Sequence, residues 1–352
     1  MTSPFDKSSA GGTQDVPARS PLAAEPVPTN APGTPPSRRF QILALDGGGY
    51  KGMFSAVVLE CLENDLGTSL VEHFDLVAGT STGGIIALAM AAGRSPSEVV
   101  EFYLRYGPRI FGHPRRRVAR QVLAAKYRAK PLAQALHTVL GDSCLWESRV
   151  PLCIPSFDLR NDHVHLFRTP HSDRLTRDWR ETMVDVAMAT SAAPTYLPAH
   201  GLRGMRLVDG GIWANNPAMV AISEAVSEFN IELADIRVLS LGTTSDVCAR
   251  PSRLDRGGML QWSFQAASVF LRGQSLAAAN ATYHLLPKDQ SLRVDPAVPD
   301  KLLRLDGVSP EELRGRAEHH SRLVSGQVKE IFLDHFAGPY TPFHTPRNAP
   351  DV

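Results

Sequence analysis

Short apolar runs alternate with helix-like segments along most of the chain. Phe40–Leu45 is the first such run, and its pattern predicts a buried strand. Further strands are predicted at Phe74–Ala78, Leu152–Leu159, Val164–Arg168, Arg206–Val208 and Ile236–Leu241. Helices are predicted at Met53–Leu66, Thr82–Ala92, Pro96–Tyr106, Met183–Thr190, Pro217–Phe229, Met259–Leu286 and Pro310–Phe336. Strands that alternate with helices predict a layered α/β fold with a mainly parallel central sheet flanked by helices.

The first 38 residues have a different composition from the rest. They hold 8 of the 27 prolines, separated mostly by Ala, Ser, Thr and Gly. A segment with so few large apolar side chains cannot bury enough surface to offset the entropy lost on ordering. The sequence therefore predicts a disordered tail over residues 1–38.

Composition and charge exclude several classes of protein. The chain has 352 residues, with 37 Lys+Arg against 36 Asp+Glu, so the net charge of +1 gives no general reason to expect nucleic acid. Its longest apolar run, Ile85–Ala92, is far shorter than the roughly 18 residues of a membrane span. The N-terminus lacks an apolar signal-peptide core, and the four cysteines have no zinc-binding spacing. We therefore expect a soluble intracellular protein without a metal, whose contact with membranes is peripheral.

A G-x-S-x-G motif lies between a predicted strand and a predicted helix. It spans Gly79–Gly83 and places Ser81 at the turn, which is the context of a nucleophile elbow. Gly79 and Gly83 lack the Cβ atoms that would clash in so tight a turn. The helix that follows adds favourable potential for developing negative charge. The alternative is a small-residue turn that only joins the two elements.

A second glycine-rich turn follows the strand Phe40–Leu45. Gly47, Gly48 and Gly49 are consecutive, and their N–H groups can form an anion-binding nest. As G-x-G-x-x-G, the turn could bind a dinucleotide, with Asp65 or Glu72 as the acidic partner. Alternatively, the N–H groups form an oxyanion hole beside Ser81. Only the second interpretation also explains the serine motif.

A third glycine-rich turn provides a carboxylate. Asp209 directly follows the predicted strand Arg206–Val208 and precedes Gly210 and Gly211. A poorly solvated carboxylate can take the proton of a serine hydroxyl. An ordinary Asp-Gly turn is the alternative. Because strand ends in α/β sheets converge on one edge, we expect the three turns to meet there.

Together, DGGGYKG, GTSTGG and DGG resemble the motifs of the patatin-like phospholipases, and the resemblance covers roughly residues 40–245. It implies the three-layer patatin-like fold and a Ser–Asp dyad, with Ser81 as nucleophile and Asp209 as general base. The amides of Gly47–Gly49 would hold the oxyanion, and acyl-ester hydrolysis would pass through an acyl-enzyme without a metal or cofactor. The residues that support these motifs are Lys51, Gly52, Gly79, Gly83, Gly210 and Gly211. Many relatives have Arg where this chain has Lys51, which leaves head-group handling open.

Longer phrases, such as FQILALDGGGYKGMFSA and DGGIWANNPAMVAISEA, are similar to the patatin effectors of bacterial CBASS anti-phage systems. That narrower resemblance implies activation by a cyclic nucleotide second messenger, membrane phospholipid as substrate, and a cytoplasmic enzyme acting at the inner membrane surface. The expected layout is a catalytic domain at 39–245, a C-terminal helical extension packed on it at 246–340, and a tail at 341–352. The extension could cover the active site or mediate self-association.

One stretch suits an anionic ligand independently of any resemblance. Between Phe102 and Gly141 there is no Asp or Glu, but there are nine basic residues. The candidates for binding an activator or a lipid head group are Arg115, Arg116, Arg117, Lys126 and Arg128. A solvated helix face is the alternative. Few aromatic residues are interleaved, so we expect no binding of DNA or RNA polymers.

Two other functions remain as alternatives at this point. One is a constitutive lipid acyl hydrolase, and the other is a non-catalytic nucleotide-binding regulator in which Ser81 is structural. A Ser-His-Asp triad would instead need a histidine after Asp209, and the first in that order is His284. No motif surrounds His284, so we expect it to be a structural or surface residue.

Overall fold

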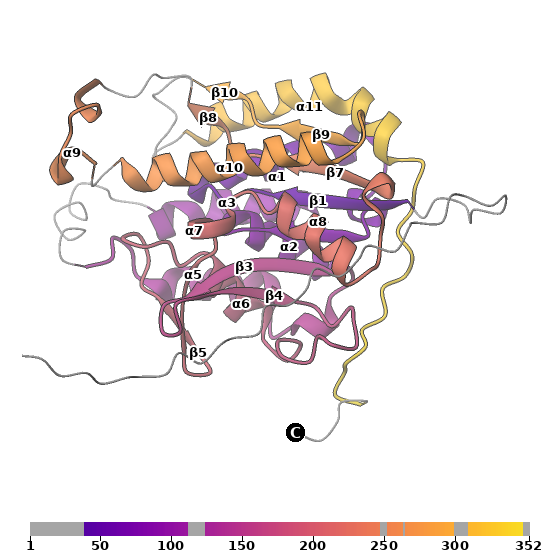
Figure 1. Ribbon diagram of the computed structural model, residues 1–352, viewed down its shortest axis with the longest axis horizontal. Helices are drawn as coiled ribbons and strands as arrows, with labels where there is room; N and C mark the ends of the chain where they lie inside the picture. The colour runs from indigo at the N-terminus through magenta and orange to yellow at the C-terminus, as the bar shows by residue number, and fades with distance from the viewer. Residues whose placement is uncertain (1–38, 112–123, 247–251, 263–264, 299–308, 348–352) are drawn as a thin grey trace, which may run out of the picture. The chain divides into compact units, whose positions relative to one another are not determined.

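The computed structural model describes residues 39–111, 124–246, 252–262, 265–298 and 309–347 (Figure 1). The expected tail 1–38 and the candidate residues Arg115–Arg117 lie outside these ranges. The helices are α1 (Gly52–Leu66), α2 (Thr82–Ala91), α3 (Pro96–Phe111), α5 (Ala129–Leu140), α6 (Met183–Thr190), α7 (Gly211–Ala214), α8 (Ala218–Ser227), α9 (Met259–Trp262), α10 (Ala266–Leu285) and α11 (Pro310–Phe332). The strands are β1 (Phe40–Leu45), β2 (Leu76–Gly79), β3 (Leu152–Asp158), β4 (His163–Arg168), β5 (His200–Leu202), β6 (Met205–Asp209), β7 (Ile236–Leu241), β8 (Ser245–Asp246), β9 (Ser291–Val294) and β10 (Ala297–Val298).

The main sheet has the strand order β5-β6-β3-β2-β1-β7-β9, and β4 pairs with the other edge of β3. Strands β3, β2, β1, β7 and β9 are parallel neighbours, whereas β4, β5 and β6 pair antiparallel. The prediction of an α/β fold with a helix-flanked central sheet is confirmed. The antiparallel strands form the part of the sheet that the simple strand–helix alternation did not predict.

Both faces of the sheet are buried, which explains why β1 is apolar at every position except Gln41. Alternate residues of a strand point to opposite faces. Leu43 and Leu45 pack in one core cluster with residues of α1, α2, α3, α5, α6 and α11. Ile42 and Ala44 pack in a second cluster, mainly with α8. Figure 1 shows α8 and α10 in front of the strands. The result is a helix–sheet–helix arrangement.

Two strands meet end to end along one edge of β3. Strand β2 pairs with the start of β3 through Ala78 and Cys153, and β6 pairs with its end through Ser156 and Asp209. Strand β4 occupies the opposite edge of β3 along the same residues. Because β2 and β6 run in opposite directions, their carboxyl ends face each other. Asp209 therefore reaches the site from an antiparallel strand, and not from a parallel strand as the sequence had suggested.

Helix boundaries follow local chemistry where the chain supplies it. A capping box starts α3, because Glu98 and Ser95 exchange side-chain-to-backbone hydrogen bonds. Helix α11 ends at Phe332 and does not reach the predicted Phe336. The Gln41 side-chain amide donates to the Phe332 carbonyl, which satisfies a terminal acceptor that further helix would have used.

The elements that the sequence analysis did not assign have weak local signals. Helix α5 has Pro131 in its first turn, where proline is tolerated, and lies in the acid-free basic stretch. Strand β9 has only four residues, and one of them is the charged Arg293. The predicted helix Met259–Leu286 is found as α9 and α10.

Candidate active site

Ser81 occupies a sharp turn between β2 and α2. Its backbone has φ 54° and ψ −121°, a conformation that non-glycine residues rarely adopt. A Cβ atom on Gly79 would collide with the carbonyl of Gly83, and one on Gly83 would collide with the carbonyl of Leu45. The turn therefore requires both glycines, as the sequence predicted. This strained geometry presents the Ser81 side chain at the end of the sheet.

The Ser81 hydroxyl donates a hydrogen bond directly to the Asp209 carboxylate, with Oγ and Oδ2 2.6 Å apart. Both residues are buried. Asp209 Oδ1 accepts a second hydrogen bond from the Gly211 N–H at 2.7 Å. Burial raises the pKa of Asp209 to about 6, although the bonds from Ser81 and Gly211 act in the opposite direction. The carboxylate is therefore a stronger base than an exposed aspartate and remains ionised at neutral pH.

Thr190, at the end of α6, is hydrogen-bonded to both turns that carry the pair, the one at Ser81 and the one after Asp209. Its hydroxyl accepts from the Ser81 N–H at 3.0 Å and donates to the Pro155 carbonyl at 2.6 Å. Its own carbonyl accepts from the Gly210 N–H at 3.3 Å. A Cβ atom on Gly210 would collide with the Pro155 carbonyl, so this turn also needs a glycine. The sequence analysis assigned no role to Thr190.

The glycine loop Gly47–Gly49 packs against the serine turn, but its three N–H groups differ. Gly47 donates to the Asn215 carbonyl at 3.0 Å, so its N–H is already used. Gly48 N–H lies 3.2 Å from the Thr82 hydroxyl oxygen. Gly49 has a left-handed backbone, with φ 60°, which favours glycine. The expectation that all three N–H groups face an oxyanion does not hold for Gly47.

Lys51 and Gly52, which follow Tyr50 in this motif, are both buried. The Lys51 side chain is buried, and its ammonium group donates to the Thr244 carbonyl at 3.2 Å. Gly52 begins α1 and lies against the Tyr103 hydroxyl, which a Cβ atom would approach to 2.7 Å. Lys51 therefore binds the protein interior, which argues against a direct contact with a lipid head group.

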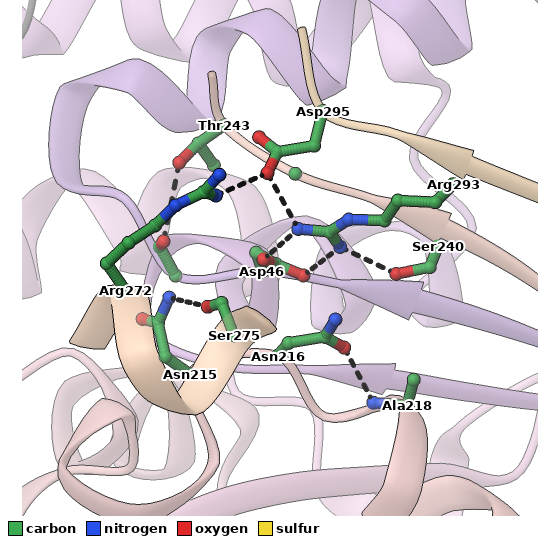
Figure 2. Close-up of polar contacts among 12 residues, drawn as sticks. Asp46, Asn215, Asn216, Ala218, Ser240, Thr243, Arg272, Ser275, Arg293 and Asp295 are labelled. Carbon is green, nitrogen blue, oxygen red and sulfur yellow. Dashed lines mark hydrogen bonds and ion pairs between the residues drawn. The ribbon is translucent and has the colours of Figure 1, made fainter. Parts of the chain in front are cut away.

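Asp46, directly before the glycine loop, is held by an arginine from the distant strand β9 (Figure 2). Arg293 binds it with two parallel hydrogen bonds of 2.6 Å, and the same guanidinium donates to Ser240 and contacts Asp295 at 3.3 Å. Burial raises the pKa of Asp46 to about 6, against the pull of Arg293. Burial alone would lower the pKa of Arg293, but the two carboxylates raise it above its usual value. No signal in the sequence around Arg293 indicates this contact.

The two basic candidates within the described ranges, Lys126 and Arg128, differ in burial. Lys126 is buried, with its ammonium group 5.4 Å from the ring centre of Tyr127 and 5.5 Å from that of Tyr196. Arg128 is exposed and precedes α5. A patch for an anionic ligand that includes Lys126 would thus have to open the contact with these two rings.

His284 is the first histidine after Asp209 in the chain, as a Ser-His-Asp triad would require. His284 is exposed near the end of α10, where its ring lies against Tyr283. Within the described ranges, no three His, Cys, Asp or Glu side chains are grouped so that they could hold a metal ion.

The sequence model of the family described as "Patatin-like phospholipase" matches residues 43–222, which include the glycine loop, Ser81 and Asp209. The chain belongs to this family. It is therefore a hydrolase, as the motifs had indicated. The identification also accounts for the order of the three motifs along the chain.

Curated relatives cover most of the chain. A "cGAMP-activated phospholipase" of Pseudomonas aeruginosa (strain BWHPSA011 / Pa011) is 32% identical over 89% of this chain and 98% of its own length. A protein of the same name from Escherichia coli (strain TW11681) is 28% identical over 87% and 95%. "Patatin-like protein 1" of Oryza sativa subsp. indica is 34% identical over 86% and 85%. This patatin-like phospholipase is thus homologous to enzymes named for activation by cGAMP. Among the described residues, no helix is long and apolar enough to cross a bilayer.

Proposed function

We propose that the protein hydrolyses acyl esters of membrane phospholipids with Ser81 as nucleophile and Asp209 as general base. The observation that carries this proposal is the 2.6 Å hydrogen bond from the Ser81 hydroxyl to the Asp209 carboxylate. It joins a strained serine turn to a carboxylate whose pKa is raised by burial, which is the pairing that serine activation requires.

The reaction follows from these contacts. Asp209 Oδ2 takes the proton from Ser81 Oγ as the oxygen attacks the ester carbonyl carbon. The tetrahedral intermediate collapses, the protonated Asp209 gives its proton to the departing alcohol, and the acyl group stays on Ser81. Asp209 then deprotonates a water molecule, which attacks the acyl-enzyme. As the fatty acid leaves, Asp209 returns this proton to Ser81 Oγ, and both groups regain their starting state. No cofactor is needed for any of these steps.

The oxyanion of the intermediate would be held by the glycine loop and the start of α2. The Gly47 N–H already donates to the Asn215 carbonyl, so the proposed donors are the N–H groups of Gly48 and Gly49. Gly48 would exchange its long contact with Thr82 for a shorter bond to the oxyanion. The N-terminus of α2, which begins directly after Ser81, adds favourable potential at the same place.

We further propose that a cyclic nucleotide activates the enzyme in anti-phage defence, at the inner surface of the membrane. The names of the bacterial relatives support cGAMP as the first activator to test. In this proposal residues 39–245 form the catalytic domain and 246–340 an extension packed on it. Strand β9 of the extension pairs with β7, and α11 packs on α1.

The test is turnover of a fluorogenic phospholipid in vesicles, with and without cGAMP, and of a soluble acyl ester. We expect cGAMP-dependent turnover that Ser81→Ala and Asp209→Asn abolish, whereas Ser223→Ala, at an exposed serine of α8, leaves it unchanged. Full activity of Ser81→Ala would overturn the dyad. Equal turnover without cGAMP would overturn the activation and favour a constitutive hydrolase.

A further inference from the structure

The glycine loop has few means of holding itself in place. Gly47, Gly48 and Gly49 have no side chains that could fix the loop, and glycine has the largest backbone freedom to lose. The loop is nevertheless held from both sides by residues beyond the family match, which ends at residue 222. We call this group the C-terminal clasp; its members are Arg272, Gln274, Ser275, Arg293 and Asp295.

The first arm of the clasp reaches the residue directly before the loop. Arg293 crosses from β9 over Ser240 of β7 and binds both carboxylate oxygens of Asp46 at 2.6 Å. Arg272 of α10 binds Asp295 at 2.9 Å, and Asp295 contacts Arg293 at 3.3 Å. Figure 2 shows the four charged side chains as one chain of contacts. Asp46 is almost completely buried, so the pair is little screened by solvent.

The second arm reaches the loop through the turn after α7. Ser275 accepts from the Asn215 side chain at 2.9 Å, and Gln274 accepts from the Asn216 N–H at 2.9 Å. The Asn215 carbonyl in turn accepts from the Gly47 N–H at 3.0 Å. Helix α10 thus holds the turn that holds the loop, and Figure 2 shows Asn215 and Ser275 facing each other.

We propose that the C-terminal clasp orients the glycine loop for catalysis, with Arg293 as its main positioning residue. Two parallel bonds to Asp46 fix both the position and the direction of the chain where it enters the loop. Gly48 and Gly49 can then present their N–H groups to the oxyanion without further rearrangement. Donors that are aligned before the reaction cost no reorganisation at the transition state. This inference rests on the proposed Ser81–Asp209 mechanism.

The test uses a soluble acyl ester, so that contact with a membrane does not enter. For Arg293→Met we expect kcat to fall about 10- to 100-fold while KM stays within about twofold, because the loop acts on the transition state. Inhibition by a trifluoromethyl ketone, whose adduct on Ser81 carries an oxyanion, should weaken by the same factor as kcat/KM. Arg293→Lys keeps the charge without the bidentate geometry, and its kcat should be intermediate.

The matched control is Arg314→Met. Arg314 ties α11 to Glu60 of α1 at 3.0 Å, which is also a contact between the C-terminal segment and the core, but it does not touch the loop. We expect its kcat and inhibitor affinity to match the wild-type values. Ser275→Ala breaks the second arm and should lower kcat less than Arg293→Met does, with the fold intact.

A wild-type kcat and inhibitor affinity in folded Arg293→Met would overturn the clasp while leaving the dyad unaffected. If Arg293→Met raises KM by the same factor as it lowers kcat, Arg293 has a general structural role, and the proposed clasp is overturned as well. If Arg293→Met does not fold, the Arg293→Lys and Ser275→Ala values decide: unchanged kcat in both contradicts the proposal. If Ser81→Ala keeps full activity, the proposed Ser81–Asp209 mechanism fails, whatever the Arg293 variants show.

Discussion

The serine turn and the glycine loop lie against each other, but different contacts hold them. Around Ser81 backbone packs directly against backbone, because Gly79 and Gly83 leave no side chains between the strand, the turn and the helix. The glycine loop depends on an ion pair between Asp46 and Arg293, which are 247 residues apart. The proposed nucleophile is therefore held by local packing, and the proposed oxyanion donors by a long-range contact. Changes at the two regions should have distinguishable effects.

The largest effect is expected from the protonation of Asp209. Its pKa of about 6 means that the carboxylate is ionised above that value and could not act as the proposed base below it. We expect kcat/KM for a soluble ester to reach a plateau above about pH 6 and to fall about tenfold per pH unit below it. A pH–rate profile measures this, and full activity retained at pH 4 would contradict the assignment of Asp209 as base.

The buried Asp209 carboxylate should also lower the free energy of unfolding at neutral pH. A folded-state pKa raised from 3.8 to about 6 means that the native state binds the proton more tightly than the unfolded state. Its contribution therefore favours folding at low pH and is lost as the pH rises through that interval. Asp209→Asn should raise the free energy of unfolding at pH 7 by up to about 3 kcal/mol, from 1.36 kcal/mol for each pKa unit.

Urea unfolding at two pH values tests this, because the gain should largely disappear near pH 4. Asp185→Asn is the control with the opposite sign. The hydrogen bond from His200 is the largest cause that lowers the pKa of Asp185, so its replacement should reduce stability at pH 7. A loss of stability for Asp209→Asn at pH 7 would contradict the prediction.

Gly83→Ala alters the serine turn and removes neither side chain of the Asp46–Arg293 ion pair. The added Cβ meets backbone carbonyls of Leu45 and Asp46, which cannot rotate away as a flexible side chain would. We expect a loss of about 1–3 kcal/mol in the free energy of unfolding, together with a strong loss of turnover. Gly201→Ala, in open space on β5, should stay near the wild-type value. Equal behaviour of the two variants would remove the distinction between the two regions.

A pair of isosteric changes gives the smallest effect and compares the regions directly. Thr190→Val leaves the Ser81 N–H and the Pro155 carbonyl without their partner and should cost about 1–2 kcal/mol. Thr243→Val, on the loop side, removes only a 3.4 Å contact with the Gly47 carbonyl and should cost less than about 1 kcal/mol. Thermal unfolding measures both, and the reverse order would contradict this account of how each region is held.

These contrasts explain which features could be predicted from the sequence. The serine turn was predictable because its glycines, strand and helix are contiguous, and β1, α6 and β7 were located because their apolar patterns are local. The weakest predictions concerned contacts across the sheet. The antiparallel approach of β6 depends on how β3 shares one edge between two strands. The use of the Gly47 N–H depends on where the turn at Asn215 lies.

Local patterns were enough to predict the α/β class, the turn at Ser81 and the carboxylate at Asp209, because glycine spacing and apolar periodicity act over a few residues. The folded chain was needed to show that Ser81 and Asp209 meet at 2.6 Å, that Lys51 turns inward, and that Arg293 binds Asp46. Such contacts join side chains far apart along the chain, and their energies depend on burial and direction, which no local pattern specifies. The chemistry of the site was therefore visible in the motifs, whereas the means of aligning it arose only on folding.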